Sequence, residues 1–216
     1  MKKVVIIAVA VIMVLGLTSI SMAAGRAAGL GITSSVHDFS ASWGGGDICA
    51  ACHTPHAATD VNGLLWNHTL STATYTMYTN ALPNADLDGA VDTTPGGISK
   101  LCLSCHDGTV ALDAFGGATG TAGTITGSFN LGSDLSVNHP ISIVYDVADL
   151  ELRLPGDVLQ PGLGNSGNIE DVLDGDGKLQ CSSCHDVHDS GESVAGTYLL
   201  RKTTAGSALC LACHDK

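Results

Sequence analysis

Residues 49–56 read CAACHTPH, and the first five letters introduce a pattern that recurs along the chain. Two cysteines are separated by two residues, and a histidine follows the second cysteine directly. This C-x-x-C-H arrangement occurs four times in the 216 residues and uses all 8 cysteines. The cysteine pairs are Cys49/Cys52, Cys102/Cys105, Cys181/Cys184 and Cys210/Cys213, and the histidines that follow them are His53, His106, His185 and His214.

C-x-x-C-H is the attachment signature of c-type haem. The two thiols add to the haem vinyl groups, and the adjacent histidine supplies the proximal ligand of the iron. Zinc knuckles also use C-x-x-C pairs, but typically with about 15–20 residues between pairs, whereas 49 residues separate Cys52 from Cys102. Zinc and structural disulfides would both leave the four histidines unexplained. The sequence therefore predicts four covalently bound haems c.

The first residues have the pattern of a secretory signal peptide. Lys2 and Lys3 precede an apolar run over 4–17, and small residues follow up to Ala23. The apolar run is short for a transmembrane helix, although an uncleaved anchor is the alternative. We expect residues 1–23 to be removed and residues 24–216 to form an exported tetrahaem domain without a membrane span. The expected location is the cell surface or the extracellular space, with the periplasm as the alternative.

The composition gives this domain little material for an ordinary core. The formal net charge is −12, which excludes ordinary nucleic-acid binding because that needs a basic surface. Aromatic residues make up only 4% of the chain, and there are 27 glycines. We therefore expect an irregular, loop-rich multihaem cytochrome c fold with short helices and little sheet, whose core is formed by four stacked covalent haems.

The ligand on the far side of each iron separates electron carriers from haem enzymes. After cleavage Met77 is the only methionine, so at most one haem could have a methionine ligand. Beyond the four motif histidines, five candidates remain for four positions: His37, His56, His68, His139 and His188. This number predicts bis-histidine haems, which are closed to substrates. A haem enzyme needs an open iron, so we expect electron transfer and no catalysis.

An internal repeat divides the chain into two diverged dihaem halves, about 30–115 and 130–216. The matching segments are SVHDFS (35–40) with SVNHPIS (136–142), CAACHTPH (49–56) with CSSCHDVH (181–188), and SKLCLSCHD (99–107) with SALCLACHD (207–215). Each half thus has one upstream histidine and one that follows a C-x-x-C-H motif. His68, in LLWNHT, lies outside this pattern, and its role as a ligand stays open; the partly similar YLLRKT at 198–203 has no histidine.

Spacing limits what His56 and His188 can reach. Each lies three residues after a proximal histidine, and positions three apart share a face of a short helix. Neither can therefore reach the opposite side of its own haem. We predict that each ligates the iron of an adjacent haem.

The mature chain resembles the small secreted tetrahaem c-type cytochromes of electroactive bacteria, and it is most similar to the OmcE-type outer-surface cytochromes. The matching stretches are SSVHDFS, CAACHTPH, LLWNHT, SKLCLSCHDGTVALDAFGG, NHPIS, CSSCHDVH and ALCLACHD. The resemblance implies bis-histidine haems, export to the cell surface and polymerisation into filaments in which a histidine of one subunit ligates a haem of the next. A free N-terminal arm with His37 and a haem at the C-terminal His214 are compatible with such an open contact.

Two functions are therefore expected, in order of preference. The first is a subunit of an extracellular conductive filament, whose partners are other copies of the chain and redox partners such as other multihaem cytochromes or extracellular acceptors. The alternative is a soluble monomeric periplasmic electron carrier. Reduction of metal oxides would be a use of the first function and needs no separate mechanism.

Overall fold

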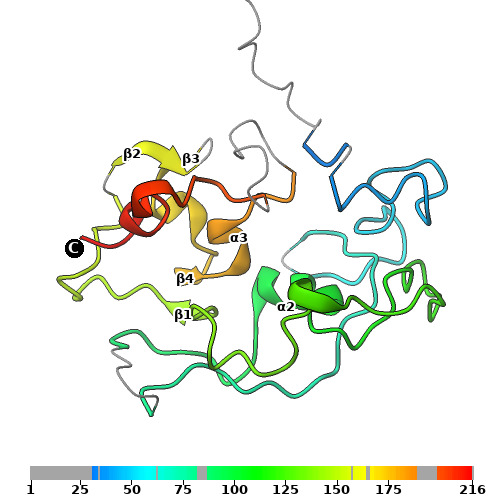
Figure 1. The fold of residues 1–216 in the computed structure, drawn as a ribbon, viewed down its shortest axis with the longest axis horizontal. Coiled ribbons are helices and arrows are strands. Elements are labelled where there is room, and N and C mark those ends of the chain that lie inside the picture. Colours follow the sequence, from blue (N-terminus) through cyan, green and yellow to red (C-terminus); the bar gives the residue numbers. More distant parts are fainter. Residues whose placement is uncertain are drawn as a thin grey trace, which may run out of the picture.

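The computed structural model describes residues 31–33, 35–61, 63–81, 87–156, 158–163, 166–188 and 199–215. The predicted signal peptide, 1–23, lies outside these residues. Turns, bends and irregular segments make up most of the described chain, and the helices and strands between them are short (Figure 1). The expected loop-rich fold with short helices and little sheet is confirmed, whereas the division into two dihaem halves stays a prediction.

The helices and strands lie mostly in the second half of the chain. In chain order they are α2 (Gly97–His106), η2 (Gly127–Phe129), β1 (Ile143–Val144), β2 (Val158–Leu163), β3 (Ser166–Asn168), η3 (Glu170–Val172), β4 (Lys178–Leu179), α3 (Cys181–Cys184), η4 (Ala205–Ser207) and η5 (Cys210–Ala212). β1 pairs with β4 and β2 with β3, both antiparallel. None of the helices in the described ranges is long and apolar enough to cross a membrane.

Three of these helices coincide with C-x-x-C-H motifs. α2 contains the second motif in its last turns and ends where Gly108 takes a positive φ of 73°, a conformation that glycine adopts readily. α3 is the third motif, and Gln180 opens it with a capping box that it forms with Ser183. η5 contains the fourth motif. The haem-attachment segments are therefore among the most regular parts of the chain.

A buried polar cluster joins α2 to α3, which pack side by side (Figure 1). Ser99 donates to Gln180 Oε1 at 2.5 Å, and Ser142 donates to the same oxygen at 3.1 Å. Cys181 N–H donates to Ser99 Oγ at 3.0 Å, and Gln180 Nε2 donates to Asp174 at 2.7 Å. Because every member of the cluster has a partner, it fixes the second and third motifs relative to each other.

Two small clusters contain most of the buried apolar side chains in the described residues. One is built from Tyr145, Ile169, Val172 and Ala212, and the other from Met77, Leu103 and Leu135. The second cluster places Met77 as a packing residue. Such thin cores agree with the low content of large side chains.

Candidate haem-binding sites

Three of the four motifs are held by the same backbone arrangement. An extended segment from elsewhere in the chain forms an antiparallel bridge with the proximal histidine, and the bridges join His53 to Trp66, His185 to Leu200 and His214 to Leu152. The residue after the histidine donates its N–H to the segment in three equivalent bonds: Thr54 to Leu65 O at 3.0 Å, Asp186 to Leu199 O at 2.8 Å and Asp215 to Glu151 O at 2.8 Å. The repeated pairing keeps each proximal histidine in an extended backbone.

One residue closes each of these three arrangements, and we call Asn67, Arg153 and Arg201 the clamp residues. Their N–H groups donate to the carbonyl of the second motif cysteine: Asn67 to Cys52 at 2.9 Å, Arg153 to Cys213 at 2.8 Å and Arg201 to Cys184 at 2.8 Å. Their side chains donate to the first residue between the cysteines: Asn67 Nδ2 to Ala50 O at 2.5 Å, Arg153 Nε to Leu211 O at 3.0 Å and Arg201 Nε to Ser182 O at 2.7 Å. Each clamp residue therefore fixes two carbonyls of one motif.

The two arginine clamps also reach the acidic residue that follows the proximal histidine. Arg153 lies 3.1 Å from Asp215, and Arg201 lies 4.0 Å from Asp186. The second pair is better shielded, since its side chains are 18% and 13% exposed, against 37% and 64% for the first. The third and fourth motifs thus carry a neutralised carboxylate beside the proximal histidine.

Among the residues that the structure describes, the second motif has no clamp residue of this kind. It is held by the end of α2 and by the 129–131 segment. Leu131 N–H donates to His106 O at 2.7 Å, and the His106 ring donates to Phe129 O at 2.9 Å. The next residue, Asp107, is only 4% exposed. It accepts hydrogen bonds from Ser71 Oγ, from Tyr75 OH at 2.6 Å, and from Thr109 N and Oγ1, both at 2.8 Å.

Three predicted distal histidines lie opposite proximal histidines. The ring centres are 6.0 Å apart for His37 and His106, 6.1 Å for His53 and His188, and 6.4 Å for His139 and His214. An imidazole nitrogen lies about 2 Å from a bound metal ion and its ring centre about 1 Å behind it, so two imidazoles on one iron have centres roughly 6 Å apart. The spacing of all three pairs therefore fits a bis-histidine iron.

Hydrogen bonds to carbonyls orient several of these rings. Nδ1 of His53 lies 2.7 Å from Leu64 O, and Nδ1 of His139 lies 3.0 Å from Pro140 O. Nδ1 of His106 is likewise 2.9 Å from Phe129 O. A carbonyl can only accept, so Nδ1 carries the proton and Nε2 keeps the lone pair that binds a metal. This is the tautomer that an axial haem ligand needs.

His37 is a partly buried residue whose Nδ1 is fully buried. Burial, together with repulsion from His106 and His185, lowers its pKa to about 4. The neutral ring is the form that binds a metal. A free N-terminal arm with His37 was noted only as compatible with a contact to another subunit; the structure places His37 beside His106 of its own chain.

His188 lies against His53, a proximal histidine of the other half, rather than against His185. His56 is exposed, and within the described ranges no ring contact brings it to another imidazole. Its role as a ligand of an adjacent haem stays a prediction. His68 is 3% exposed, and its two ring nitrogens each lie 3.0 Å from a carbonyl oxygen, that of Thr69 and that of Ala111.

The motif cysteines, whose thiols stand where thioethers are predicted, lie close to cysteines of other motifs. Cys102 and Cys181 are hydrogen-bonded to each other, which raises the pKa of Cys102 and lowers that of Cys181 to about 7. Burial raises the pKa of Cys105 to about 12, and the nearby Cys52 adds to the shift. Burial likewise raises the pKa of Cys184 to about 11, with a contribution from Cys213. Successive motifs are therefore neighbours in space.

The residues present fit covalent haem better than a bare metal ion. Among the described residues, no group of three or more His, Cys, Asp or Glu side chains could hold an ion. The imidazoles instead come in pairs, which suffices for haem because the porphyrin supplies the other four nitrogens. Trp66 Nε1, beside His53, is buried without a protein partner, and a haem propionate is an acceptor of the kind that this N–H needs.

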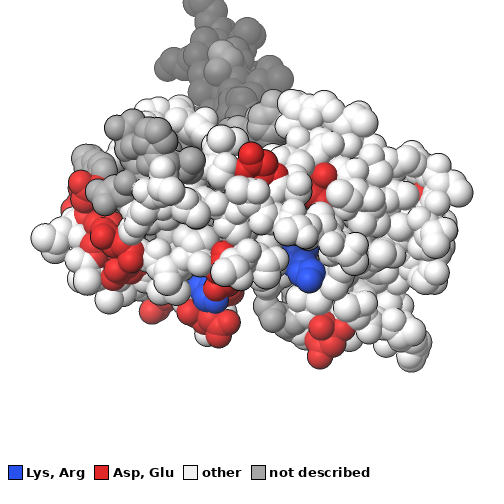
Figure 2. Space-filling model, turned by 90° about the horizontal axis from the view of Figure 1, so that it is seen from below, with Lys and Arg blue, Asp and Glu red and all other residues white. Residues whose placement is uncertain are grey.

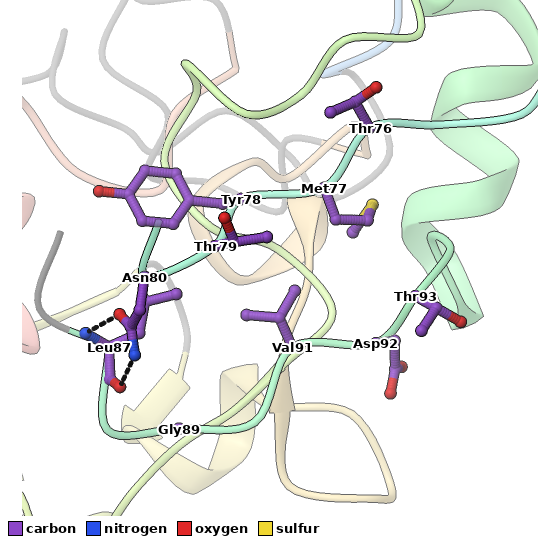
Figure 3. A pocket seen from close by; sticks show the side chains of 10 residues that line it. All are labelled: Thr76, Met77, Tyr78, Thr79, Asn80, Leu87, Gly89, Val91, Asp92 and Thr93. Atoms are coloured by element: carbon purple, nitrogen blue, oxygen red, sulfur yellow. Dashed lines mark hydrogen bonds between the residues drawn. The ribbon is translucent and has the colours of Figure 1, made fainter. Parts of the chain in front are cut away.

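A pocket of about 430 Å³ lies apart from these histidines, between segments 76–80 and 87–93 (Figure 3). Two hydrogen bonds between Asn80 and Leu87, at 2.8 and 2.9 Å, close one end of it. Its lining contains no cysteine or histidine. The pocket is therefore not part of the haem-binding set.

Sequence reasoning found the motif residues and the histidines but missed the clamp residues. The similarity between LLWNHT and YLLRKT was a usable signal, because Asn67 and Arg201 occupy equivalent positions in these segments. In the sequence analysis, this similarity led only to the question of whether His68 is a ligand. The segment around Arg153 shares just a leucine and an arginine with YLLRKT and is too short to recognise by eye.

Comparisons with known proteins bear on the last two motifs. Residues 174–216 match a protein-family model described as a doubled CXXCH motif. A search of curated proteins finds no match. The matched region begins just before β4 and contains α3 and η5. Together with the two further copies of the motif upstream, the match indicates a multihaem c-type cytochrome-like protein that binds haem and fits an electron carrier rather than an enzyme.

Proposed function

We propose that this chain transfers electrons through four bis-histidine c-type haems. The observation that carries the proposal is the spacing of three imidazole pairs, with ring centres 6.0 to 6.4 Å apart. Each pair combines a motif histidine with one of the histidines left over after the motifs are assigned. Unrelated surface histidines have no reason to adopt this spacing three times.

The contacts between motif cysteines support a row of haems in chain order. Cys52 lies near Cys105, Cys102 touches Cys181, and Cys213 lies near Cys184. Each contact joins one motif to the next, so the attached haem edges would follow one another from the first motif to the fourth. The buried cluster around Gln180 fixes the central step of this row.

When bound, haem iron supplies the one-electron chemistry, by alternating between two oxidation states. The chain supplies the rest: the three imidazole pairs would hold an iron from both sides, and carbonyls hold the rings of His53, His106 and His139 in the ligating tautomer. Closed irons do not bind substrates, which is why electron transfer is favoured over haem catalysis.

We further propose that the chain is a subunit of an extracellular filament. Three of the five distal candidates face a motif histidine in these pairs, and the other two candidates are His56 and His68. His68 has both ring nitrogens directed at carbonyl oxygens, whereas His56 is exposed. An exposed ligand can be donated to a haem of a second copy, which is an open, head-to-tail contact.

The alternative is a soluble monomeric periplasmic carrier, and the surface charge is compatible with either. Acidic side chains are spread over the face shown in Figure 2, with few basic ones among them. Such a surface favours basic redox partners over nucleic acid.

The test is spectroscopic and uses the secreted holoprotein. We expect a mass increase equivalent to four haems and a low-spin spectrum that carbon monoxide does not change. A high-spin haem that binds carbon monoxide in the assembled protein would refute the closed-iron proposal. Electron microscopy of the same fraction separates the two functions, because filaments support the first and a monomeric sedimentation value supports the carrier.

A further inference from the structure

The residue after the proximal histidine differs between the motifs in a way that matters for charge. It is Thr54 in the first motif and aspartate in the other three. Asp186 and Asp215 have an arginine clamp beside them, at 4.0 and 3.1 Å. Within the described part of the chain, no lysine or arginine forms an ion pair with Asp107.

Asp107 is a buried charge that neutral groups hold in place. It is 4% exposed, and all its partners are hydroxyl or backbone N–H groups: Ser71, Tyr75 and Thr109. These groups donate their hydrogens to the carboxylate oxygens, and no cation lies among them. The carboxylate is thus stabilised as an anion without being neutralised.

We infer that Asp107 makes the haem attached at Cys102 and Cys105 the hardest of the four to reduce. This inference rests on the proposed function. A fixed negative charge beside the proximal histidine stabilises the oxidised iron, which carries one more positive charge than the reduced iron. Asp107 adjoins His106 directly in the chain and does not touch the iron, so it is a tuning residue and not a ligand.

The haem at Cys102 and Cys105 also matters for electron flow because of its position. In the proposed row the second haem lies in the interior, between the first and third motifs. An electron that crosses the row must pass through this low-potential position. Asp107 would therefore set the energetically least favourable step of the path.

The experiment is a redox titration of holoprotein that carries Asp107→Asn. Removing the charge should favour the reduced form of one haem by on the order of tenfold, which corresponds to about 59 mV for a one-electron couple. The other three midpoint potentials should move less. Asp176→Asn is the matched control, because Asp176 is an exposed carboxylate in a surface turn and its removal changes the net charge equally.

A second variant distinguishes an effect of the Asp107 charge from an effect of a loosened site. Tyr75→Phe removes one hydrogen bond to Asp107 but keeps the carboxylate, so the potential should stay or fall. An equal rise in Tyr75→Phe and Asp107→Asn would show that loosening of the site, and not its charge, is responsible. Unchanged potentials in Asp107→Asn would also overturn the inference.

A measurement on the unmodified protein needs no variant at all. The three imidazole pairs have interplanar angles of 46°, 20° and 70°, and the low-spin EPR signal of a bis-histidine haem depends on this angle. During stepwise reduction, the signal of the 46° pair should disappear last, and its earlier loss would contradict the inference. A high-spin haem in the unmodified protein would instead count against the proposed function, so the two failures are distinguishable.

Discussion

Arg201 should contribute more to stability than its counterpart Arg153, although the two side chains make the same contacts. Arg201 Nε donates to Ser182 O at 2.7 Å, and its 18% exposed side chain lies beside the 13% exposed Asp186. Replacing it with alanine removes the hydrogen bond and takes the nearby cation away from a shielded carboxylate. The backbone bond from residue 201 to Cys184 remains.

The magnitude follows from burial. A hydrogen bond from a charged group contributes about 1.5–3 kcal/mol, and loss of a cation beside a shielded carboxylate adds to it, so we expect Arg201→Ala to cost about 3 kcal/mol. Arg153 makes a 3.0 Å bond and an ion pair with Asp215, whose side chain is 64% exposed. The longer, exposed hydrogen bond lies at the low end of its range, about 1.5 kcal/mol, and such an exposed pair adds about 0–1 kcal/mol. Arg153→Ala should therefore cost about 2 kcal/mol.

The assay is urea denaturation of the oxidised holoprotein, followed by far-ultraviolet circular dichroism after mass spectrometry has shown that all haems are attached. Arg201→Lys is the control: it keeps the positive charge but lacks the planar fork that reaches a carbonyl and a carboxylate together. It should fall between the native protein and Arg201→Ala. Equal losses for the two alanine variants, or a larger loss for Arg153→Ala, would refute the burial argument.

Two further predictions concern the distal histidines. His188→Ala should leave all haems attached but convert the haem at Cys49 and Cys52 to a high-spin form that binds carbon monoxide. The reason is that the His188 ring faces His53 at 6.1 Å. A high-spin haem at Cys181 and Cys184 instead would mean that the pairing is wrong. His56→Ala should leave the spectrum of the separated subunit unchanged and abolish filaments in electron micrographs. If the separated variant subunit binds carbon monoxide and the native separated subunit does not, His56 is a ligand within its own chain.

Local signals in the sequence predicted the attachment chemistry and the irregular fold. The motif spacing is a covalent requirement of haem, so it is visible in any single copy. The scarcity of large side chains similarly predicted thin cores such as the one around Met77. These features depend on neighbouring residues or on overall composition, which a sequence displays directly.

The sequence could not predict which residues far apart in the chain lie next to each other in the fold. His56 and His188 follow their motifs with the same spacing and are both exposed. Among the described residues, however, only His188 faces another imidazole, that of His53. The difference arises from how the third motif packs across the first, which no local pattern records. Arg153 is hidden for the same reason, since it lies 57 residues before Cys210 and meets the fourth motif only in the folded chain.

The clamp of the fourth motif sets a lower limit on any self-sufficient fragment of this protein. The region that matches the doubled-motif family begins at 174, but Arg153 and Leu152, which hold His214 and Cys213, come from outside it. A two-haem module excised at 174 would therefore retain its attachment chemistry and lose half of its scaffold. Recombination or engineering that transplants such a module would have to start before Glu151 to carry a complete unit.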